Sequence, residues 1–290
     1  MKSLIMHISS AHDMDDPRIF YRHCSSLHEH NYKIIYSGPF KKIKKNQMIN
    51  NIEVIELKFN NRDIIKKNAI LTIPISKYSN RILRFTLGNF FLLKNVFKVK
   101  PAIVEFHDPD LVFVGLVLRI FGYKVIANIH EDIADQILNK FWIPYIFRFI
   151  LSKTFKIFYP IVLRLSSDAR IFATDHIKKK YSLKNSIVTR NFPTKNFIKK
   201  NKFNKKPPVI KNKLKLIYVG VLEERRGLKF WNNIAILDQV EEIHLVGKFS
   251  PKESERQFTK KYLSNKKIFI HGQRDYRFIS NYIDMCDLGI

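Results

Sequence analysis

The sequence predicts an α/β protein built from two Rossmann-like, doubly wound parallel-sheet domains. Three observations lead to this prediction. Short apolar runs alternate with helical patterns along the chain, as a parallel sheet with crossover helices requires. Several of these runs end in polar residues or glycine, as strands do at the ligand-binding edge of such a sheet. A basic segment without hydrophobic period, 195–213, separates two stretches of this pattern.

The first third of the chain begins with strand, helix and strand. The apolar run 2–8 predicts the first strand, and the polar loop Ser9–Arg18 follows it. Apolar positions at helical spacing predict a helix over 19–30. The runs 33–37, closed by Gly38-Pro39, and 52–57 predict two more strands, joined by a basic, asparagine-rich loop. Basic and apolar residues alternate in segment 62–98, so we expect one or two helices there that pack on the sheet.

Segment 102–136 predicts a strand–helix–strand unit. Its strands are Ile103–Phe106 and Lys124–Ile129, and the apolar stretch between them contains no proline and ends at Gly122. Each strand is followed at once by histidine and acid, His107-Asp108 and His130-Glu131. Because ligands bind at the carboxyl ends of parallel strands, we expect both histidines at the ligand crevice.

The remainder of the chain continues the alternation. Helical spacing over 137–164 is interrupted by Pro144 and Pro160. The elements expected after it are a strand at 169–174, a helix at 175–181 and a strand at 186–190. Beyond the linker we expect strands at 214–219, 243–246 and 267–270, helices at 228–237, 254–263 and 276–285, and a strand beginning at 287–290. The predicted domains are therefore 1–194 and 214–290, with the linker 195–213 between them and the second domain incomplete.

The net charge of +27 is concentrated in the first domain and the linker, because residues 214–290 carry only +3 of it. Such a charge fits nucleic acid, an anionic membrane surface or phosphorylated substrates, but a lysine-rich composition throughout the chain explains it equally well. No RNP1 or helix-turn-helix motif occurs, so we do not expect nucleic-acid binding.

Cysteine usage and the N-terminus bear on the compartment of the protein. The two cysteines, Cys24 and Cys286, lie far apart and form no CxxC pair, which excludes a disulfide framework. The first apolar run is too short for a signal peptide, so we expect a cytoplasmic protein. The aromatic and basic region 141–165 carries too many charges for a spanning helix. It is either core-packing helix or a segment that lies on a membrane surface.

Three groups of residues carry possible chemistry. His107 and His130 are suited to sugar hydroxyls or to an oriented imidazole, although a lone histidine is more often structural. Neither His-x3-His nor paired cysteines occur, which disfavours a metal site. The loop with Asp16 and Arg18 contains no glycine, so it is not a dinucleotide fingerprint. It forms either a polar rim or a solvated acidic loop.

The third group lies in the turn after the first strand of the second domain. Gly220 at the strand end allows a ligand to approach the backbone, and Arg225, Arg226 and Gly227 follow near a helix start. Arginine beside a helix N-terminus is suited to a diphosphate.

Taken in order, five stretches of this chain resemble the family 4 glycosyltransferases of GT-B fold. The stretches are HISSAHDMDDPRIFYRHCSSL, EFHDPDL, NIHEDIADQIL, RNFP and YVGVLEERRGL. The resemblance implies two Rossmann-like domains, an N-terminal one for the acceptor and a C-terminal one for a nucleotide-sugar. It also implies a retaining reaction with no cofactor and no metal. The likeness is imperfect at Val221, where many members have arginine.

The resemblance also implies roles for individual residues. His130 is the residue beside the transferred sugar and is our catalytic candidate. The acceptor side of the cleft is expected to include Asp16, Arg18, His107, Asp108 and Glu131. The donor diphosphate is expected at Gly220, Arg225, Arg226 and Gly227.

The function implied is hexosyl transfer from a nucleotide-sugar to a glycan or polyprenyl-phosphate-linked acceptor in bacterial surface polysaccharide biosynthesis. Such an enzyme is expected in the cytoplasm, with peripheral contact to the anionic inner face of the membrane. The family's E-x7-E motif, which contacts the donor, would lie beyond Ile290. The alternative is therefore a truncated, non-catalytic remnant of such an enzyme.

Overall fold

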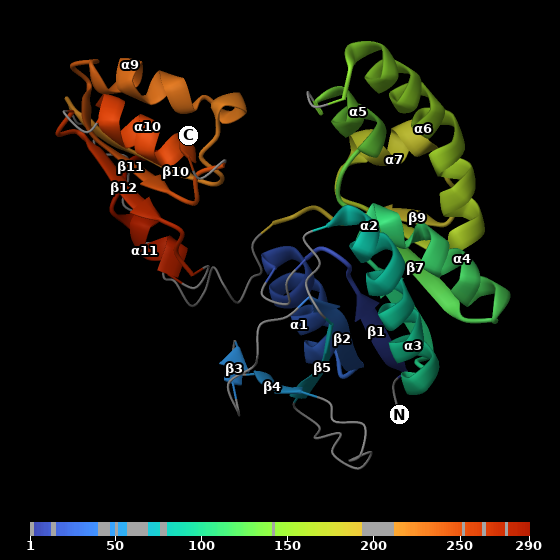
Figure 1. The fold of residues 1–290 in the computed structure, drawn as a ribbon. Helices are drawn as coiled ribbons and strands as arrows, with labels where there is room; N and C mark the ends of the chain where they lie inside the picture. The colour runs from blue at the N-terminus through green and yellow to red at the C-terminus, as the bar shows by residue number, and fades with distance from the viewer. Residues whose placement is uncertain are drawn as a thin grey trace. The chain divides into compact units, whose positions relative to one another are not determined.

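The computed structural model describes residues 3–12, 16–39, 47–49, 52–56, 69–75, 80–140, 143–192, 212–250, 253–262, 265–275 and 278–290. The chain forms two compact units, Met1–Phe192 and Pro193–Ile290 (Figure 1). All but the last two residues of the predicted linker 195–213 lie outside the described residues.

The first unit is built on one nine-stranded sheet. Its spatial order is β3-β4-β5-β2-β1-β6-β7-β8-β9, and all neighbours are parallel except β3 and β4. The strands are β1 (Leu4–Ile8), β2 (Lys33–Pro39), β3 (Gln47–Ile49), β4 (Ile52–Glu56), β5 (Ala69–Ile75), β6 (Ile103–Phe106), β7 (Lys124–Ile129), β8 (Ala169–Phe172) and β9 (Ser186–Val188).

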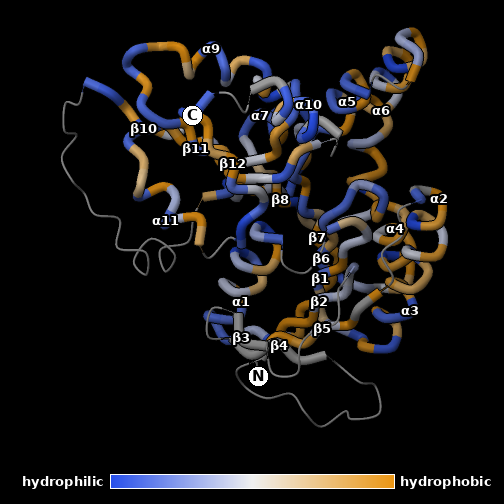
Figure 2. The backbone as a smooth tube through the Cα atoms, turned by 60° about the vertical axis from the view of Figure 1, so that its left-hand side comes forward, coloured by the Kyte–Doolittle hydropathy of each residue, from blue (hydrophilic) through white to orange (hydrophobic). Residues whose placement is uncertain are grey.

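Helices cover both faces of this sheet. They are η1 (Pro17–Cys24), α1 (Ser25–Glu29), α2 (Arg81–Leu83), η2 (Arg84–Gly88), α3 (Asn89–Val99), η3 (Pro109–Leu111), α4 (Val112–Ile120), α5 (Ile133–Leu138), α6 (Tyr145–Ser166) and α7 (Asp175–Tyr181). In both views α1 lies on one side of the strands and α3 and α4 on the other (Figures 1 and 2).

Successive side chains of a strand point to opposite faces of the sheet, and this determines which helices each side chain packs against. Met6 and Ile8 of β1 pack with Leu92 of α3 and Leu118 of α4 in the main core. The strand β5 is mostly apolar and appears largely orange in Figure 2. The intervening residue of β1, His7, faces the opposite side, which η1 covers.

The strand order places a topological switch point between β1 and β6. From β1 the chain moves through η1 and α1 to β2 on one side, whereas β6 pairs with β1 on the other. The loops after β1 and β6 therefore diverge at this edge. In open α/β sheets, ligands bind outside the carboxyl ends of the strands at such a point.

The second unit has a four-stranded parallel sheet in the order β12-β11-β10-β13. Its elements are β10 (Leu214–Val219), η4 (Glu224–Arg226), η5 (Leu228–Phe230), α9 (Trp231–Ala235), β11 (Val240–Val246), α10 (Glu253–Tyr262), β12 (Ile268–Gly272), α11 (Ile279–Asp284) and β13 (Leu288–Gly289). Leu216, Leu245, Trp231 and Phe258 form part of its core. Its switch point lies between β10 and β13, because β10 pairs with both β11 and β13.

Two element predictions for the first unit are wrong. Segment 69–75, expected within a helical region, is β5, and the loop before β4 contains β3. A seven-residue apolar run fits a buried strand and a buried helix equally well by periodicity. Pro160 does not interrupt α6, which runs from Tyr145 to Ser166. Lys156, whose carbonyl loses its helical partner to Pro160, is exposed, so solvent can reach that carbonyl.

Gly115 sets the distance between α4 and α6. A Cβ at this position would lie 2.6 Å from the Ser166 carbonyl oxygen and 2.9 Å from Phe106. We therefore expect Gly115→Ala to lower the free energy of unfolding by about 1–3 kcal/mol, because the helices must move apart. Urea denaturation measures this. Gly289→Ala is the control, since its Cβ would meet nothing within 4 Å. A G115A loss no larger than that of G289A would contradict the expectation.

Candidate functional site

Polar side chains form a row across three neighbouring strands of the first unit. His7 on β1 is in register with Glu105 on β6, and His107 is two residues further along. Asn128 on β7 donates to Glu105 at 2.7 Å, and His130 follows two residues later. Because side chains two residues apart point to the same face, all five residues lie on the face that η1 covers. The row leads to the carboxyl edge at the switch point.

Asp108, at the end of β6, forms hydrogen bonds with the loop after β1. Its Oδ2 accepts hydrogen bonds from Ser9 Oγ at 2.5 Å, from the Ser10 amide at 2.7 Å and from the Ala11 amide at 3.2 Å. The side chain is buried. Ser10 Oγ also donates to Asp110, at 2.8 and 2.9 Å. The two loops at the edge are therefore joined by hydrogen bonds before any ligand is present.

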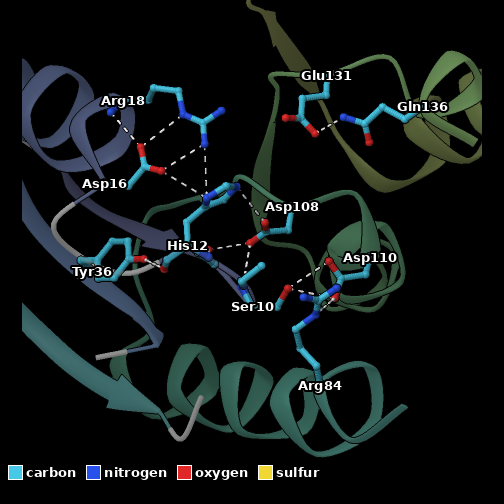
Figure 3. Close-up of polar contacts among 12 residues, drawn as sticks. Ser10, His12, Asp16, Arg18, Tyr36, Arg84, Asp108, Asp110, Glu131 and Gln136 are labelled. Carbon is cyan, nitrogen blue, oxygen red and sulfur yellow. Dashed lines mark hydrogen bonds and ion pairs between the residues drawn. The ribbon is translucent and has the colours of Figure 1, made fainter. Parts of the chain in front are cut away.

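Asp16 and Arg18 meet at the start of η1 (Figure 3). Asp16 caps this helix by accepting from the Arg18 amide at 2.8 Å. It also pairs with the Arg18 guanidinium, with Nη2 at 3.0 Å and Nε at 3.2 Å. Burial acts to raise the pKa of Asp16, but the hydrogen bonds from His12 and Arg18 outweigh burial and leave that pKa well below its usual range. The pair is therefore ionised and orients the guanidinium beside the edge.

His12 lies between two carboxylates. Its Nδ1 is 3.2 Å from Asp16 Oδ2, and its Nε2 is 3.2 Å from Asp108 Oδ1. The Tyr36 hydroxyl donates to its carbonyl oxygen at 2.6 Å. Burial acts to lower the His12 pKa, and Arg18 does so to a smaller extent. The Asp16 hydrogen bond and the charges of Asp108 and Asp16 outweigh them, so the pKa is raised.

We expect His12 to titrate above its usual pKa of about 6.5 in the folded protein. A raised pKa in the folded state means that its charge contributes stability below about pH 6.5, and that this contribution is lost as the pH rises through the folded pKa. Asp16→Asn is expected to lower the His12 pKa. Titration of the wild type and of D16N by long-range ¹H–¹⁵N NMR measures both values. A His12 pKa that D16N leaves unchanged would contradict this electrostatic account.

His107 and His130 stack at the edge. Their ring centroids are 5.8 Å apart and the planes differ by 10°. His107 is buried, and its Nε2 lies 3.0 Å from His7 Nδ1. Burial, reinforced by Arg18, lowers the pKa of His130 to about 3, so its ring is neutral at physiological pH. Both ring nitrogens of His130 are shielded from solvent and have no hydrogen-bond partner among the described residues.

A small pocket lies beside His130. Its polar walls come from His12, His107, His130 and Glu131, and its apolar walls from Pro109, Ile129 and Ile133. Glu131 accepts a hydrogen bond from Gln136 at its rim (Figure 3). The remaining wall is Tyr159 of α6, whose buried hydroxyl has no hydrogen-bond partner in the described part of the chain. The pocket thus offers an imidazole and a phenol that a ligand hydroxyl can pair with.

In the first unit, the structure brings together all six residues predicted from the sequence: Asp16, Arg18, His107, Asp108, His130 and Glu131. Asp16 and Asp108 meet through His12, and Glu131 lines the pocket with His107 and His130. Their assigned roles at an acceptor site remain predictions.

The predicted diphosphate turn of the second unit is rich in glycine. Gly220, Gly247 and Gly272 lie at the ends of three neighbouring strands, where the Gly220 amide donates to Val246 and the Gly247 amide to Gly272. A Cβ on Gly247 would lie 1.7 Å from the Gly220 carbonyl oxygen, so only glycine fits there. Gly227, with φ of 79°, reverses the chain after η4. Glycine at position 247 therefore allows the ends of two neighbouring strands to approach closely.

The arginines of this turn belong to η4, which contains Arg225 and Arg226. The Arg226 side chain is exposed, and its Nε donates to Glu223 at 3.0 Å. Hydrogen bonds with Tyr218 and Glu223 raise the pKa of Arg226, so its charge is permanent. The turn provides a fixed positive charge beside a glycine-rich strand edge, the arrangement that a phosphate requires.

Four further residues of the first site were not predicted from the sequence: His7, His12, Glu105 and Tyr159. The alternating polar positions in IMHIS, VEFHD and ANIHE are a signal for the buried row that includes His7 and Glu105. His12 stands in a loop, and Tyr159 lies far along the chain in a helix with many aromatics. For these two we find no signal in the sequence.

Comparison with solved structures identifies the fold. The chain is 13% identical to the sucrose-phosphate synthase from Thermosynechococcus elongatus, with a TM-score of 0.64 over 99% of this chain and 74% of that one. It is 12% identical to the lipopolysaccharide outer core galactosyltransferase WaaB, with a TM-score of 0.53 over 97% and 71%. A UDP-N-acetylglucosamine 2-epimerase from Rickettsia bellii is also similar, at 12% identity and a TM-score of 0.53 over 98% and 72%.

Sequence comparison adds nothing to this likeness. No protein-family model matches the chain, and none of the curated proteins matches it. At these identities the structural likeness establishes the fold alone. The predicted fold class is confirmed: the chain has Rossmann-like parallel-sheet units, and its structural neighbours include GT-B glycosyltransferases.

Proposed function

We propose that the protein is a retaining glycosyltransferase that moves a hexosyl group from a nucleotide-sugar to a glycan or polyprenyl-phosphate-linked acceptor. The observation that supports this most strongly is the pocket at the switch point of the first unit. There His130 presents two ring nitrogens that no described residue engages, beside Asp16, Arg18 and Asp108. A neutral imidazole can both donate to and accept from sugar hydroxyls.

The donor site of this proposal is the turn Gly220–Gly227. The exposed Arg226 charge supplies one side of a diphosphate site, beside the glycine strand ends. No cofactor and no metal is required in the proposed reaction, in keeping with the family 4 resemblance. Bacterial surface polysaccharide biosynthesis is the setting that we propose for it.

The proposed membrane contact rests on α6. Ten of its bulky apolar side chains are at least 38% exposed beside Tyr145, which is 74% exposed. The helix carries Arg148, Lys153, Lys156 and Arg164 and no acidic residue. Among the described helices, none combines the length and hydropathy that crossing a bilayer requires. Apolar exposure with only positive charge fits a helix lying in the interface of an anionic membrane.

Donor titration tests the proposed activity. Calorimetry with UDP- and GDP-sugars is expected to show saturable binding of one of them, weakened at least tenfold by Arg226→Ala and unchanged by exposed Arg256→Ala. Transfer to a membrane extract should then release the nucleotide, and NMR of the product should show the anomeric configuration of the donor. No binding of any donor would favour the non-catalytic alternative. Epimerisation of UDP-N-acetylglucosamine without acceptor would favour the epimerase class.

For the membrane contact, we expect co-sedimentation with vesicles that contain phosphatidylglycerol and not with pure phosphatidylcholine. Replacing Lys153 and Lys156 by glutamine should weaken binding about thirtyfold, since each basic residue contributes about 1 kcal/mol near an anionic surface. Lys179 and Lys184 are exposed outside α6, and their double glutamine variant is the control of equal charge. Equal losses in the two variants would show a dependence on net charge alone, without a specific role for α6.

A further inference from the structure

Three potential ligand atoms converge beneath the site. His7 Nδ1 lies 3.0 Å from His107 Nε2, and Glu105 Oε1 lies 3.8 Å from the first and 3.7 Å from the second. All three side chains are buried. The register of β1 and β6 sets this arrangement, because His7 is the direct partner of Glu105 and His107 follows on the same face.

Protein hydrogen bonds leave this cluster incomplete. A neutral imidazole has one N–H, and the contact between His7 and His107 can use the proton of only one ring. The other inward nitrogen accepts that proton, and both inward nitrogens lie too far from Glu105 Oε1 for a hydrogen bond, at 3.8 and 3.7 Å. Oε1 receives one donor, Asn128 Nδ2 at 2.7 Å.

The cluster also lacks a fixed positive charge. Among the described residues, no lysine or arginine forms an ion pair with Glu105, whose neighbours at ion-pair distance are all histidines. Two comparable clusters in the same chain have one. Lys180 lies 2.5 Å from Asp132 and 2.7 Å from Asp135, next to His176. Lys215 lies 2.8 Å from Glu242, next to His244. A buried carboxylate is costly without a cation, and this cluster alone of the three has none.

We propose that His7, Glu105 and His107 bind one divalent transition-metal ion, with Zn²⁺ the best match to the ligand types. The point equidistant from the three ligand atoms, in their plane, lies roughly 2 Å from each, which is the length of a Zn–N or Zn–O bond. Two imidazoles and a carboxylate are a common set for this ion. Asn128 orients Glu105, as partners of metal ligands usually do.

The proposed ion is structural. It would join β1 to β6 just before the loops of the site diverge, and it would fix the His107 ring on which His130 stacks. His23 Nδ1, 3.5 Å from Glu105 Oε1, is the nearest described candidate for a fourth ligand. The proposal does not depend on glycosyl transfer, because it concerns residues that hold the edge in place, of which only His107 also lines the pocket.

Metal analysis of the full chain tests the proposal. After chelation and dialysis, Co²⁺ titration should give one binding site with the visible absorption of a low-symmetry site, and Zn²⁺ should displace the Co²⁺ stoichiometrically. Glu105→Gln and His7→Asn should each raise the apparent dissociation constant for Co²⁺ at least a hundredfold. Removing a residue that only hydrogen-bonds to a metal ligand weakens metal binding about 10–100-fold, and removing a ligand itself should weaken it more. Asp135→Asn and His176→Asn, in the cluster that Lys180 neutralises, should leave it unchanged.

Two outcomes would overturn the proposal. One is a wild-type chain that takes up neither Co²⁺ nor Zn²⁺ at micromolar concentration. The other is a site whose affinity survives Glu105→Gln and His7→Asn but is lost in Asp135→Asn. Circular dichroism identifies any variant that fails to fold. If E105Q or H7N does so, His107→Gln replaces it, and the thermal midpoint of the wild type must rise with Zn²⁺ while that of the folded variant does not.

Discussion

Replacing His130 by alanine is expected to lower kcat for the proposed sugar transfer by about 10²–10³-fold while the chain remains folded. His130 directly follows β7 and lines the pocket. Neither of its ring nitrogens has a hydrogen-bond partner among the other described residues. Its removal therefore breaks no hydrogen bond within the described protein, and the loss falls on the contact with substrate. Initial rates at saturating donor and acceptor measure kcat, and thermal unfolding measures the fold.

The form of the loss separates two roles for His130. Asparagine has a donor and an acceptor but cannot take up a proton, so His130→Asn should retain more activity than alanine if hydrogen bonding is the main contribution. His176→Ala, on the exposed surface of α7, is the matched control and should be without effect. An H130A variant with unchanged kcat would remove His130 from the reaction and leave it as a wall of the pocket.

The two halves of the first site differ in how far sequence could predict them. His107, Asp108, His130 and Glu131 follow strands directly, and parallel strands bring their carboxyl ends to one edge whatever the details of packing. Their assembly could therefore be expected from strand boundaries alone. Asp16 and Arg18 could be placed near this edge for the same reason, because their loop follows β1.

His12 and Tyr159 depend on geometry that no short pattern records. His12 lies between Asp16 and Asp108. Three donors of the loop after β1 hold that loop against the end of β6 by hydrogen bonds to Asp108, and His12 belongs to this loop. Tyr159 lines the pocket from α6, where no pattern among the many aromatic residues of that helix shows which one faces the site. Predicting the strand β5 failed for a related reason: its partners, β2 and β4, decide between strand and helix for an apolar run.

Asp108→Ala is expected to lower the free energy of unfolding by about 3–5 kcal/mol, the largest stability loss at this edge. One carboxylate oxygen accepts from Ser9 Oγ and from the amides of Ser10 and Ala11, and the other lies 3.2 Å from His12. Alanine leaves the Ser9 hydroxyl and the amides of Ser10 and Ala11 without this acceptor. It also removes one of the two carboxylates beside His12. Chemical denaturation with both fluorescence and circular dichroism measures the change.

Asp108→Asn distinguishes the hydrogen bonds from the charge. Its amide oxygen can still accept from the three loop donors, so most of the stability should return, whereas the His12 pKa should fall because the second anion is gone. Asp110→Asn is the comparison at the neighbouring carboxylate, which accepts only from Ser10 among these loop residues. If D108N is as unstable as D108A, the charge of Asp108 holds the edge together. If D108A is no worse than D110N, the loop after β1 is held by its other contacts, and the preformed edge does not depend on Asp108.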